Sequence, residues 1–196
     1  MTVRLAVESD IPAILEMGRA MVDESPRWRP MPYAAEKVET MCRLSIEQGG
    51  AFVAEVSDMA PRCAAEVFTW EREHPGEPLI PLGESRLVGV VLGLLAQHWF
   101  STTWYAGTLA VYVVPAYRGR GTFQALVAHF EEWGAQSGAL EWCVGVHTGL
   151  DDARMAAAYR HLGYFDAGIN LRKPVAVPAR AAADLQPRPS DSARSG

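Results

Sequence analysis

Two glycines and two arginines follow a stretch of apolar residues in the middle of the chain. The segment reads VYVVPAYRGRGT over residues 111–122. Glycines that come after a buried strand and before a helix leave backbone N–H groups accessible at the positive end of the helix dipole. Arg118 and Arg120 can add charge-assisted hydrogen bonds to phosphate oxygens, each worth about 1.5 to 3 kcal/mol when desolvated. We therefore expect this turn to bind a pyrophosphate.

Two common phosphate-binding motifs do not fit this segment. The P-loop needs a lysine followed by serine or threonine directly after its last glycine, and the segment has no such lysine. The dinucleotide fingerprint G-x-G-x-x-G matches Gly119 and Gly121, but Gln124 stands where the third glycine belongs.

A third pattern fits. The segment resembles the acetyl-CoA signature of the GNAT (GCN5-related N-acetyltransferase) family, R/Q-x-x-G-x-G/A after a strand that ends in V-x-P. Arg118, Gly121 and the preceding run 113–115 match it. A separate stretch, AAAYRHLGYF at 156–165, resembles the helix-to-strand motif of the same family. By order of elements, the resemblance extends over residues 1–173.

The resemblance implies an acetyl-CoA site in which the pantetheine arm pairs with residues 111–114 and the pyrophosphate lies on the amides of residues 118–123. Phe123 stands where the family usually has Gly or Ala, and Asp152 where an asparagine often contacts the cofactor. Helix N-capping is the alternative explanation for Asp152 and its neighbour Asp151. The cofactor-binding residues expected in this way are Val111, Val113, Val114, Arg118, Gly119, Arg120, Gly121, Thr122, Phe123, Asp152 and Tyr159.

The resemblance also implies direct transfer. A deprotonated acceptor amine attacks the thioester held between two splayed strands, 108–114 and 140–146. Tyr159 is then the expected general acid for the departing thiolate, with packing on a helix face as the alternative. The order of elements brings four candidate bases within reach, and a chain of water molecules is the alternative to all of them. These candidates are Glu55, His98, Tyr112 and, beyond the next strand, His147.

Hydrophobic periodicity predicts the elements that position these residues. Strands are expected at 3–7, 51–56, 87–96, 108–115 and 140–146, with a final strand pair within 164–172. Helices are expected after Asp10, at about 34–48, from 122 to about 136, and at 151–162. This order predicts a mixed α/β sheet with helices on both faces. The family resemblance implies the GNAT fold, an α/β fold with a mixed, mostly antiparallel twisted sheet of six to seven strands flanked by about four helices.

A length of 196 residues suits one domain, which buries roughly 70% of the surface of the unfolded chain. We expect a GNAT domain over 1–173 and a flexible tail over 174–196, which is rich in Ala, Pro, Arg and Ser. Residues 57–86 are expected to form an inserted hairpin loop. Recognition of a cationic amine by its acidic residues is one interpretation, and a partly disordered hairpin tip is the other. The aromatic residues between 98 and 105 are compatible with a pocket wall, an interface or ordinary core.

Charge and composition exclude several other classes. A net charge of −5 gives nucleic acid no general attraction, which disfavours a nucleic-acid-binding protein. The N-terminus does not read as a signal peptide, and no apolar run approaches the ~20 residues that a bilayer requires. We therefore expect a cytoplasmic protein with no membrane contact. The three cysteines form no C-x-x-C pair, so no metal site is expected.

These observations together predict an acetyl-CoA-dependent N-acetyltransferase. Its acceptor is expected to be an amine on a small molecule, a peptide or a modified nucleobase, and the sequence does not choose among them. The alternative, prompted by Phe123 and Asp152, is an acyl-CoA-binding module with weak or no catalysis. The family resemblance also makes a homodimer possible.

Overall fold

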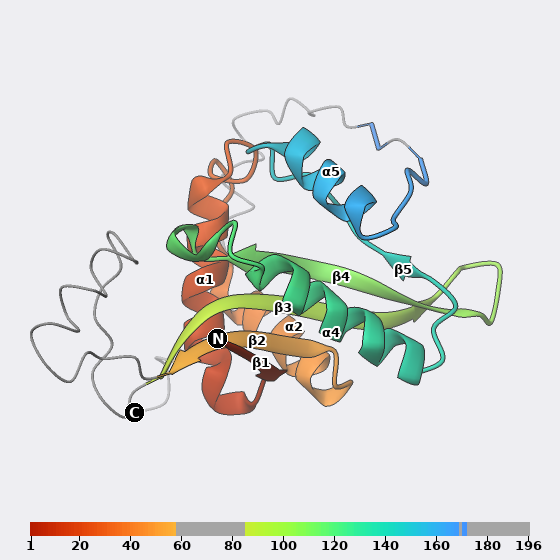
Figure 1. Cartoon of the computed structure of the whole chain (residues 1–196), viewed down its shortest axis with the longest axis horizontal. Coiled ribbons are helices and arrows are strands. Elements are labelled where there is room, and N and C mark those ends of the chain that lie inside the picture. Colours follow the sequence, from red (N-terminus) through yellow and green to blue (C-terminus); the bar gives the residue numbers. More distant parts are fainter. Residues whose placement is uncertain (58–84, 169, 172–196) are drawn as a thin grey trace, which may run out of the picture. The chain divides into compact units, whose positions relative to one another are not determined.

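The computed structural model describes residues 1–57, 85–168 and 170–171. Residues Met1–Gly163 form one unit, and the described residues after Gly163 belong to a second. In chain order, the elements of the first unit are β1 (Thr2–Leu5), the 3-10 turn η1 (Glu8–Asp10), α1 (Ile11–Glu24), α2 (Ala35–Glu47), β2 (Ala51–Ser57), β3 (Ser85–Gln97), β4 (Trp104–Val113), the 3-10 turn η2 (Pro115–Tyr117), α4 (Thr122–Gln136), β5 (Trp142–Cys143) and α5 (Asp152–His161) (Figure 1).

The strands form one mixed sheet. Within the described part of the chain it has five strands in the order β1-β2-β3-β4-β5. The first three pairs are antiparallel, and β4 pairs with β5 in parallel. The predicted mixed, mostly antiparallel α/β fold is therefore confirmed. β4 begins at Trp104, so Trp104 and Tyr105, expected in a connection, belong to a strand.

The last strands are shorter than expected. A strand was predicted over 140–146, but β5 contains only Trp142–Cys143. It pairs with β4 at Ala106 and Gly107, and no pairing follows, so the residues after Cys143 have no ladder to join. Residues 164–168, expected to begin a final strand pair, adopt neither helix nor strand. This accounts for five strands, rather than six or seven, in the residues that the structure describes.

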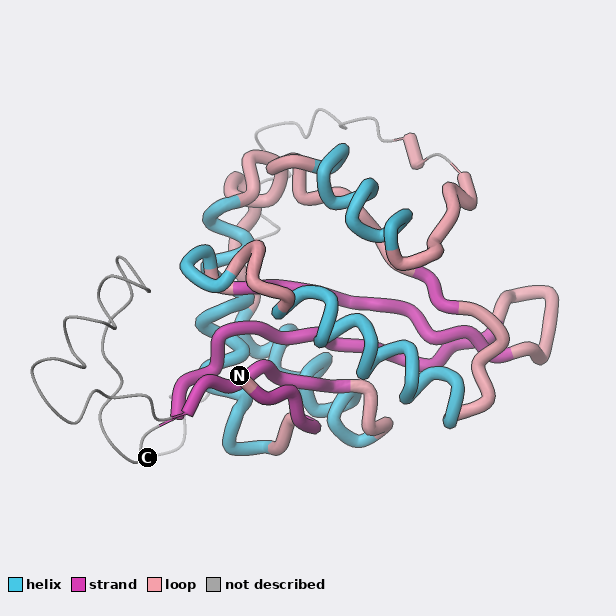
Figure 2. The backbone as a smooth tube through the Cα atoms, viewed as in Figure 1, coloured by secondary structure: helices cyan, strands magenta, loops and turns pink. Residues whose placement is uncertain are grey.

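The sheet separates two hydrophobic cores. On one face, residues of α1 and α2 pack against inward-facing side chains of β2, β3 and β4. On the opposite face, α4 packs against the alternate residues of the same strands. Figures 1 and 2 show this arrangement, with α4 on one side of the sheet and α1 and α2 on the other. Strands covered on both faces explain why β3 reads as a nearly continuous apolar run.

Two expected regions fall largely outside the described residues. The expected insert, 57–86, has its ends in strands, because β2 includes Ser57 and β3 begins at Ser85. Its remaining residues, 58–84, and the expected tail, 174–196, lie outside the described ranges. Across the described residues, no helix combines the length and the apolar character needed to cross a membrane.

Candidate functional site

The pairing of β4 with β5 ends in the middle of β4, on the strand that leads to the predicted phosphate turn. Their register runs from Ala106 opposite Trp142 to Gly107 opposite Cys143 and then stops. A register shift follows directly in β4, where Leu109 is the extra residue between Thr108 and Ala110. From Thr108 onward, β4 therefore has no strand partner on its β5 side among the described residues (Figure 1). The predicted splay is present, although β5 itself is short.

The main-chain N–H and C=O groups of Val111 and Val113, near the end of β4, face this open edge. The amide of Val114 donates to the Val88 carbonyl of β3 at 2.9 Å. Since successive residues of a strand direct their polar groups to opposite edges, Val113 and Val111 direct theirs away from β3. A ligand that lies alongside β4 can therefore form hydrogen bonds with the main chain, as a further strand would.

The turn after β4 adopts a backbone that only glycine adopts easily. Gly119 and Gly121 have φ angles of 78° and 84°, and a Cβ at either position would meet no atom within 4 Å. Glycine is required at these two positions because of the positive φ angle, and not because neighbouring atoms would clash with a side chain. Gly121 is the N-cap of α4, and no side chain caps the helix there. The first-turn amides of α4 have no intrahelical acceptor and lie at the positive end of its dipole.

Thr122 stabilises this turn through a buried hydrogen bond. Its side chain is buried, and its hydroxyl donates to the Tyr117 carbonyl at 3.2 Å. Thr122 therefore offers a ligand only its backbone amide. Arg120, the second arginine of the turn, has its guanidinium 5.7 Å from the centre of the Tyr117 ring.

Arg118 turns back toward the end of β4. Its Nε donates to the Val113 carbonyl at 2.8 Å, and its Nη2 donates to the Glu24 carboxylate at 2.6 Å. The guanidinium also lies 5.4 Å from the centre of the Tyr112 ring. Arg118 thus has an anionic partner within the protein, which the sequence argument for a ligand anion did not foresee. Its side chain stays 43% exposed, so it is accessible to a second anion.

Glu24, the last residue of α1, is a site residue that sequence reasoning missed. Its second carboxylate oxygen accepts a hydrogen bond from the Tyr112 hydroxyl at 2.6 Å. Tyr112 and Arg118 lie 88 and 94 residues further along the chain. No local pattern around Glu24 signals this contact, because a carboxylate at a helix end usually faces solvent.

Tyr112, one of the predicted bases, is held in its protonated form. Burial, and next the hydrogen bond to Glu24, raise the pKa of Tyr112 to about 12. Near pH 7 its hydroxyl therefore donates a hydrogen bond and has little capacity to accept a proton.

Two other predicted bases lie away from the splay. Glu55 is on β2, which pairs with β1 and β3 and not with β4. Hydrogen bonds from Ser85 and then Arg4 lower its pKa. His98 follows β3, and its Nε2 lies 2.6 Å from a carboxylate oxygen of Glu141, at the paired end of β4 and β5. The structure does not bring these residues together with Tyr159. The main-chain carbonyl of His147, the remaining candidate base, accepts a hydrogen bond from Arg27 at 3.0 Å.

Tyr159 lies on α5 against the first turn of α4. Its ring meets that of Phe123 edge to face, with 5.0 Å between ring centres and 76° between ring planes. Only 4% of the residue is exposed. Burial, and next the charge of Glu131, raise the pKa of Tyr159 well above its ordinary value. The phenol is therefore neutral at physiological pH and carries the proton that an acid catalyst needs.

The two aspartates at the start of α5, the N-cap Asp151 and the first helical residue Asp152, make different contacts. Asp151 caps the helix, because its carboxylate accepts from the Arg154 amide at 3.1 Å. Asp152 accepts from the Gly149 amide at 2.8 Å and from the Thr148 hydroxyl at 3.3 Å. Asp151 matches the capping alternative, whereas Asp152 braces the preceding loop.

The aromatic residues near the β3–β4 turn are largely solvent-exposed. Trp99 is 95% exposed, Phe100 69% and Trp104 45%. This excludes ordinary core packing for these three side chains and leaves a surface role open.

Comparison with known proteins identifies the family of the chain. A sequence profile of the Acetyltransferase (GNAT) family matches residues 33–164. This match covers more than half of the chain, and the chain therefore belongs to the GNAT acetyltransferase family. No curated protein matches the chain.

Several solved structures share the fold. An aminoglycoside antibiotic 6'-N-acetyltransferase from Acinetobacter haemolyticus is 15% identical, with a TM-score of 0.56 over 91% of this chain and 100% of the other. An acetyltransferase from Trypanosoma brucei is 16% identical, with a TM-score of 0.55 over 89% and 99%. An aminoglycoside acetyltransferase from an uncultured soil metagenomic sample, solved in complex with sisomicin, is 13% identical, with a TM-score of 0.54 over 89% and 96%. At these identities the likeness shows the fold.

Proposed function

We propose that this protein transfers an acetyl group from acetyl-CoA to a primary amine by direct attack within a ternary complex. One observation carries the proposal: the glycine turn that precedes α4 follows, after the short turn η2, on a strand whose main chain is open along one edge from Thr108 onward among the described residues. The open edge suits the amides of a pantetheine arm, and the turn suits a diphosphate. Membership of the GNAT family supports the same arrangement.

In this proposal, the amides of residues 119–123 bind the diphosphate. The amide of Arg118 contributes less, because it already donates to the Pro115 carbonyl at 3.2 Å. The pantetheine pairs with Val111 and Val113 and directs the thioester toward the bulge at Leu109. A strand N–H then stabilises the oxyanion that forms when the amine attacks.

Tyr159 protonates the departing thiolate in this scheme. Its neutral phenol suits that role, because it carries a proton throughout the physiological pH range. No side chain is assigned as the base. Glu55 and His98 are engaged elsewhere, and Tyr112 stays protonated. Among the candidates this leaves His147 and a chain of water molecules to take the proton of the amine.

We propose a small molecule as the acceptor. Two of the structural neighbours are named as aminoglycoside acetyltransferases, and one of them is a complex with sisomicin. These neighbours support small amines as a class and do not select one compound. A homodimer and a cytoplasmic location remain further proposals.

A screen of amines with acetyl-CoA tests the function, with release of CoA followed by a thiol reagent. We expect CoA release that depends on the amine, and acetylated product by mass spectrometry. Calorimetry with CoA alone tests the donor site independently. Absence of CoA binding at millimolar ligand would overturn the proposal as a whole.

One observation favours the alternative of an acyl-CoA-binding module. The Phe123 ring contacts Tyr159 at the first turn of α4, where the family usually has a small residue. CoA binding without acetylation of any amine in the screen would support that alternative.

A further inference from the structure

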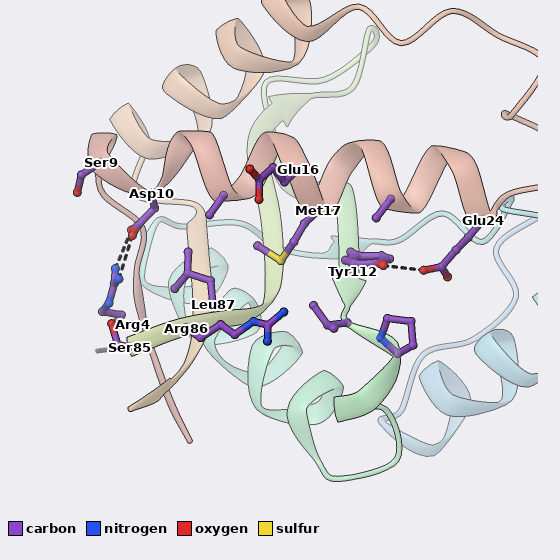
Figure 3. Close-up of a pocket in the computed structure, with 14 residues that line it drawn as sticks. Arg4, Ser9, Asp10, Glu16, Met17, Glu24, Ser85, Arg86, Leu87 and Tyr112 are labelled. Atoms are coloured by element: carbon purple, nitrogen blue, oxygen red, sulfur yellow. Dashed lines mark hydrogen bonds and ion pairs between the residues drawn. The ribbon is translucent and has the colours of Figure 1, made fainter. Parts of the chain in front are cut away.

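Glu24 lies between the proposed diphosphate site and a cavity. On one side is Arg118 of the phosphate turn, whose Nη2 donates to Glu24. On the other side is a cavity of about 630 Å³ along α1, bounded by β3 and the end of β4. Figure 3 shows Glu24 and Tyr112 joined at one end of this cavity, with Arg4 and Asp10 at the other. The carboxylate of Glu24 thus contacts Arg118 of the phosphate turn and also lines a cavity large enough for a small molecule.

We propose that Glu24 couples binding of the two substrates. Glu24 holds Arg118 in the uncomplexed protein, and when a diphosphate takes Arg118, the released carboxylate binds an ammonium group of the acceptor other than the amine that is acetylated. This inference rests on the proposed function, because it requires that Arg118 contacts the diphosphate of CoA. It adds a residue, a site and an order of binding that the proposed function does not contain.

The first argument is competition for one guanidinium. Arg118 places its Nε on the Val113 carbonyl and its Nη2 on Glu24. A diphosphate carries more negative charge than a single carboxylate, and a planar guanidinium pairs well with phosphate oxygens. The ion pair is partly exposed, with 43% of the Arg118 side chain and 26% of the Glu24 side chain accessible. Such pairs are weak, so a diphosphate can displace Glu24 at small cost.

The second argument is the charge that the cavity would then carry. Two arginines and three carboxylates line it: Arg4, Arg86, Asp10, Glu16 and Glu24. Arg4 already bonds both Asp10 and Glu55. While Arg118 neutralises Glu24, that end of the cavity holds a closed ion pair. When Arg118 moves to the diphosphate, the carboxylate of Glu24 is left without a cation and is partly shielded from water. A cationic group of a ligand would stabilise it.

The third argument is that Glu24 is held ready for this role. The Tyr112 hydroxyl donates to the carboxylate oxygen that Arg118 does not use. This bond remains when Arg118 leaves, so the carboxylate stays directed at the wall of the cavity. A cationic ligand would meet an oriented group with no large change in the backbone.

Calorimetry with CoA tests the competition. We expect Glu24→Gln to tighten CoA binding about two- to fivefold, the range in which a weak, partly exposed ion pair competes. Asp23→Asn is the matched control, because Asp23 is exposed on the same helix and its loss changes the net charge equally. Asp23→Asn should leave the affinity unchanged. In an Arg118→Ala background, Glu24→Gln should have no further effect, because the competing pair is already absent.

The CoA affinities of the wild type and of Glu24→Gln distinguish failure of this inference from failure of the proposed function. If the wild-type protein binds CoA and Glu24→Gln binds it equally or more weakly, Glu24 supports the turn and does not compete, and the inference fails. If the wild-type protein does not bind CoA, the proposed function itself fails. Circular dichroism and thermal melts confirm that each variant is folded, and the Arg118→Ala pair gives a second comparison should one single variant be unstable.

A diamine probe tests the released carboxylate. Binding of 1,4-diaminobutane is measured with and without saturating CoA, which lacks the acetyl group and allows no turnover, and 1,4-butanediol serves as the neutral control. We expect CoA to tighten diamine binding severalfold in the wild type and not in Glu24→Gln, with no effect on the diol. Equal diamine affinity with and without CoA, or an enhancement that survives Glu24→Gln, would overturn the inference.

Discussion

Tyr159 is buried on α5 with its ring against Phe123, and its hydroxyl is the proposed proton donor. Burial keeps the phenol neutral, which suits an acid and excludes a base. The ring and the hydroxyl therefore make separable contributions: the ring packs against Phe123, and in the proposed mechanism the hydroxyl gives up its proton.

Replacement of Tyr159 by phenylalanine separates these contributions. The ring contact with Phe123 is retained, so CoA affinity should stay within about twofold of the wild type. Turnover should fall by about one to three orders of magnitude, as is usual when an acid catalyst is lost. Steady-state kinetics with an acetylated amine and calorimetry with CoA measure the two quantities. Unchanged turnover would exclude Tyr159 as the acid.

The turn before α4 is the element on which the proposed donor site depends. Its shape comes from two glycines at positive φ, and Thr122 braces it by bonding back to Tyr117. The turn is thus built largely from backbone. A change in backbone conformation should affect it more than a change in surface charge.

Two glycine substitutions test the turn. Gly121 and Gly138 flank α4 with φ angles of 84° and 79°, and a Cβ added at either position would meet no atom within 4 Å. Alanine at either position should destabilise the protein by about 1 to 2 kcal/mol, because the left-handed region disfavours a side chain. Only Gly121→Ala should weaken CoA binding, by severalfold or more. Urea unfolding and calorimetry check the two effects, and equal CoA affinity in both variants would argue against the turn as the diphosphate site.

At the scale of the whole molecule, a charged network links β1, η1 and β2. Arg4 donates to both carboxylate oxygens of Asp10, at 2.7 and 2.9 Å, and to Glu55 at 2.6 Å. The pKa of Asp10 is lowered, first by the hydrogen bonds from Arg4. Since the ionised form is favoured in the folded state, Asp10 stabilises the protein at pH values above its unfolded pKa, and this contribution is lost as pH falls through the folded pKa.

Acid titration of stability tests this network. Asp10→Asn should lower the free energy of unfolding at pH 7, and the difference from the wild type should shrink as pH falls below about 3.9, the usual pKa of Asp. Urea unfolding at a series of pH values measures it. Glu47→Gln, at the exposed end of α2, is the control. A difference that stays constant down to the lowest pH at which the protein folds would contradict the role assigned to Asp10.

Local sequence patterns predicted the order of elements, the mixed sheet and the glycine turn. Those features depend on hydrophobic periodicity and on the backbone freedom of glycine, which are readable within a few residues. The length of β5 was not predictable in this way, because a strand ends where its partner diverges. The Glu24 contact was missed for a similar reason: its partners meet it only after the sheet and α1 have packed together.

The separation of β4 from β5 means that amide hydrogen exchange can report on a ligand at the open edge of β4. The amides of Val111 and Val113 face the open edge, whereas that of Val114 is bonded to β3. In heavy water the first two should exchange quickly and the third slowly. Addition of CoA should slow exchange at Val111 and Val113 and leave Val114 as it was. Amide-resolved exchange would thus locate the pantetheine arm with no need to identify an acceptor.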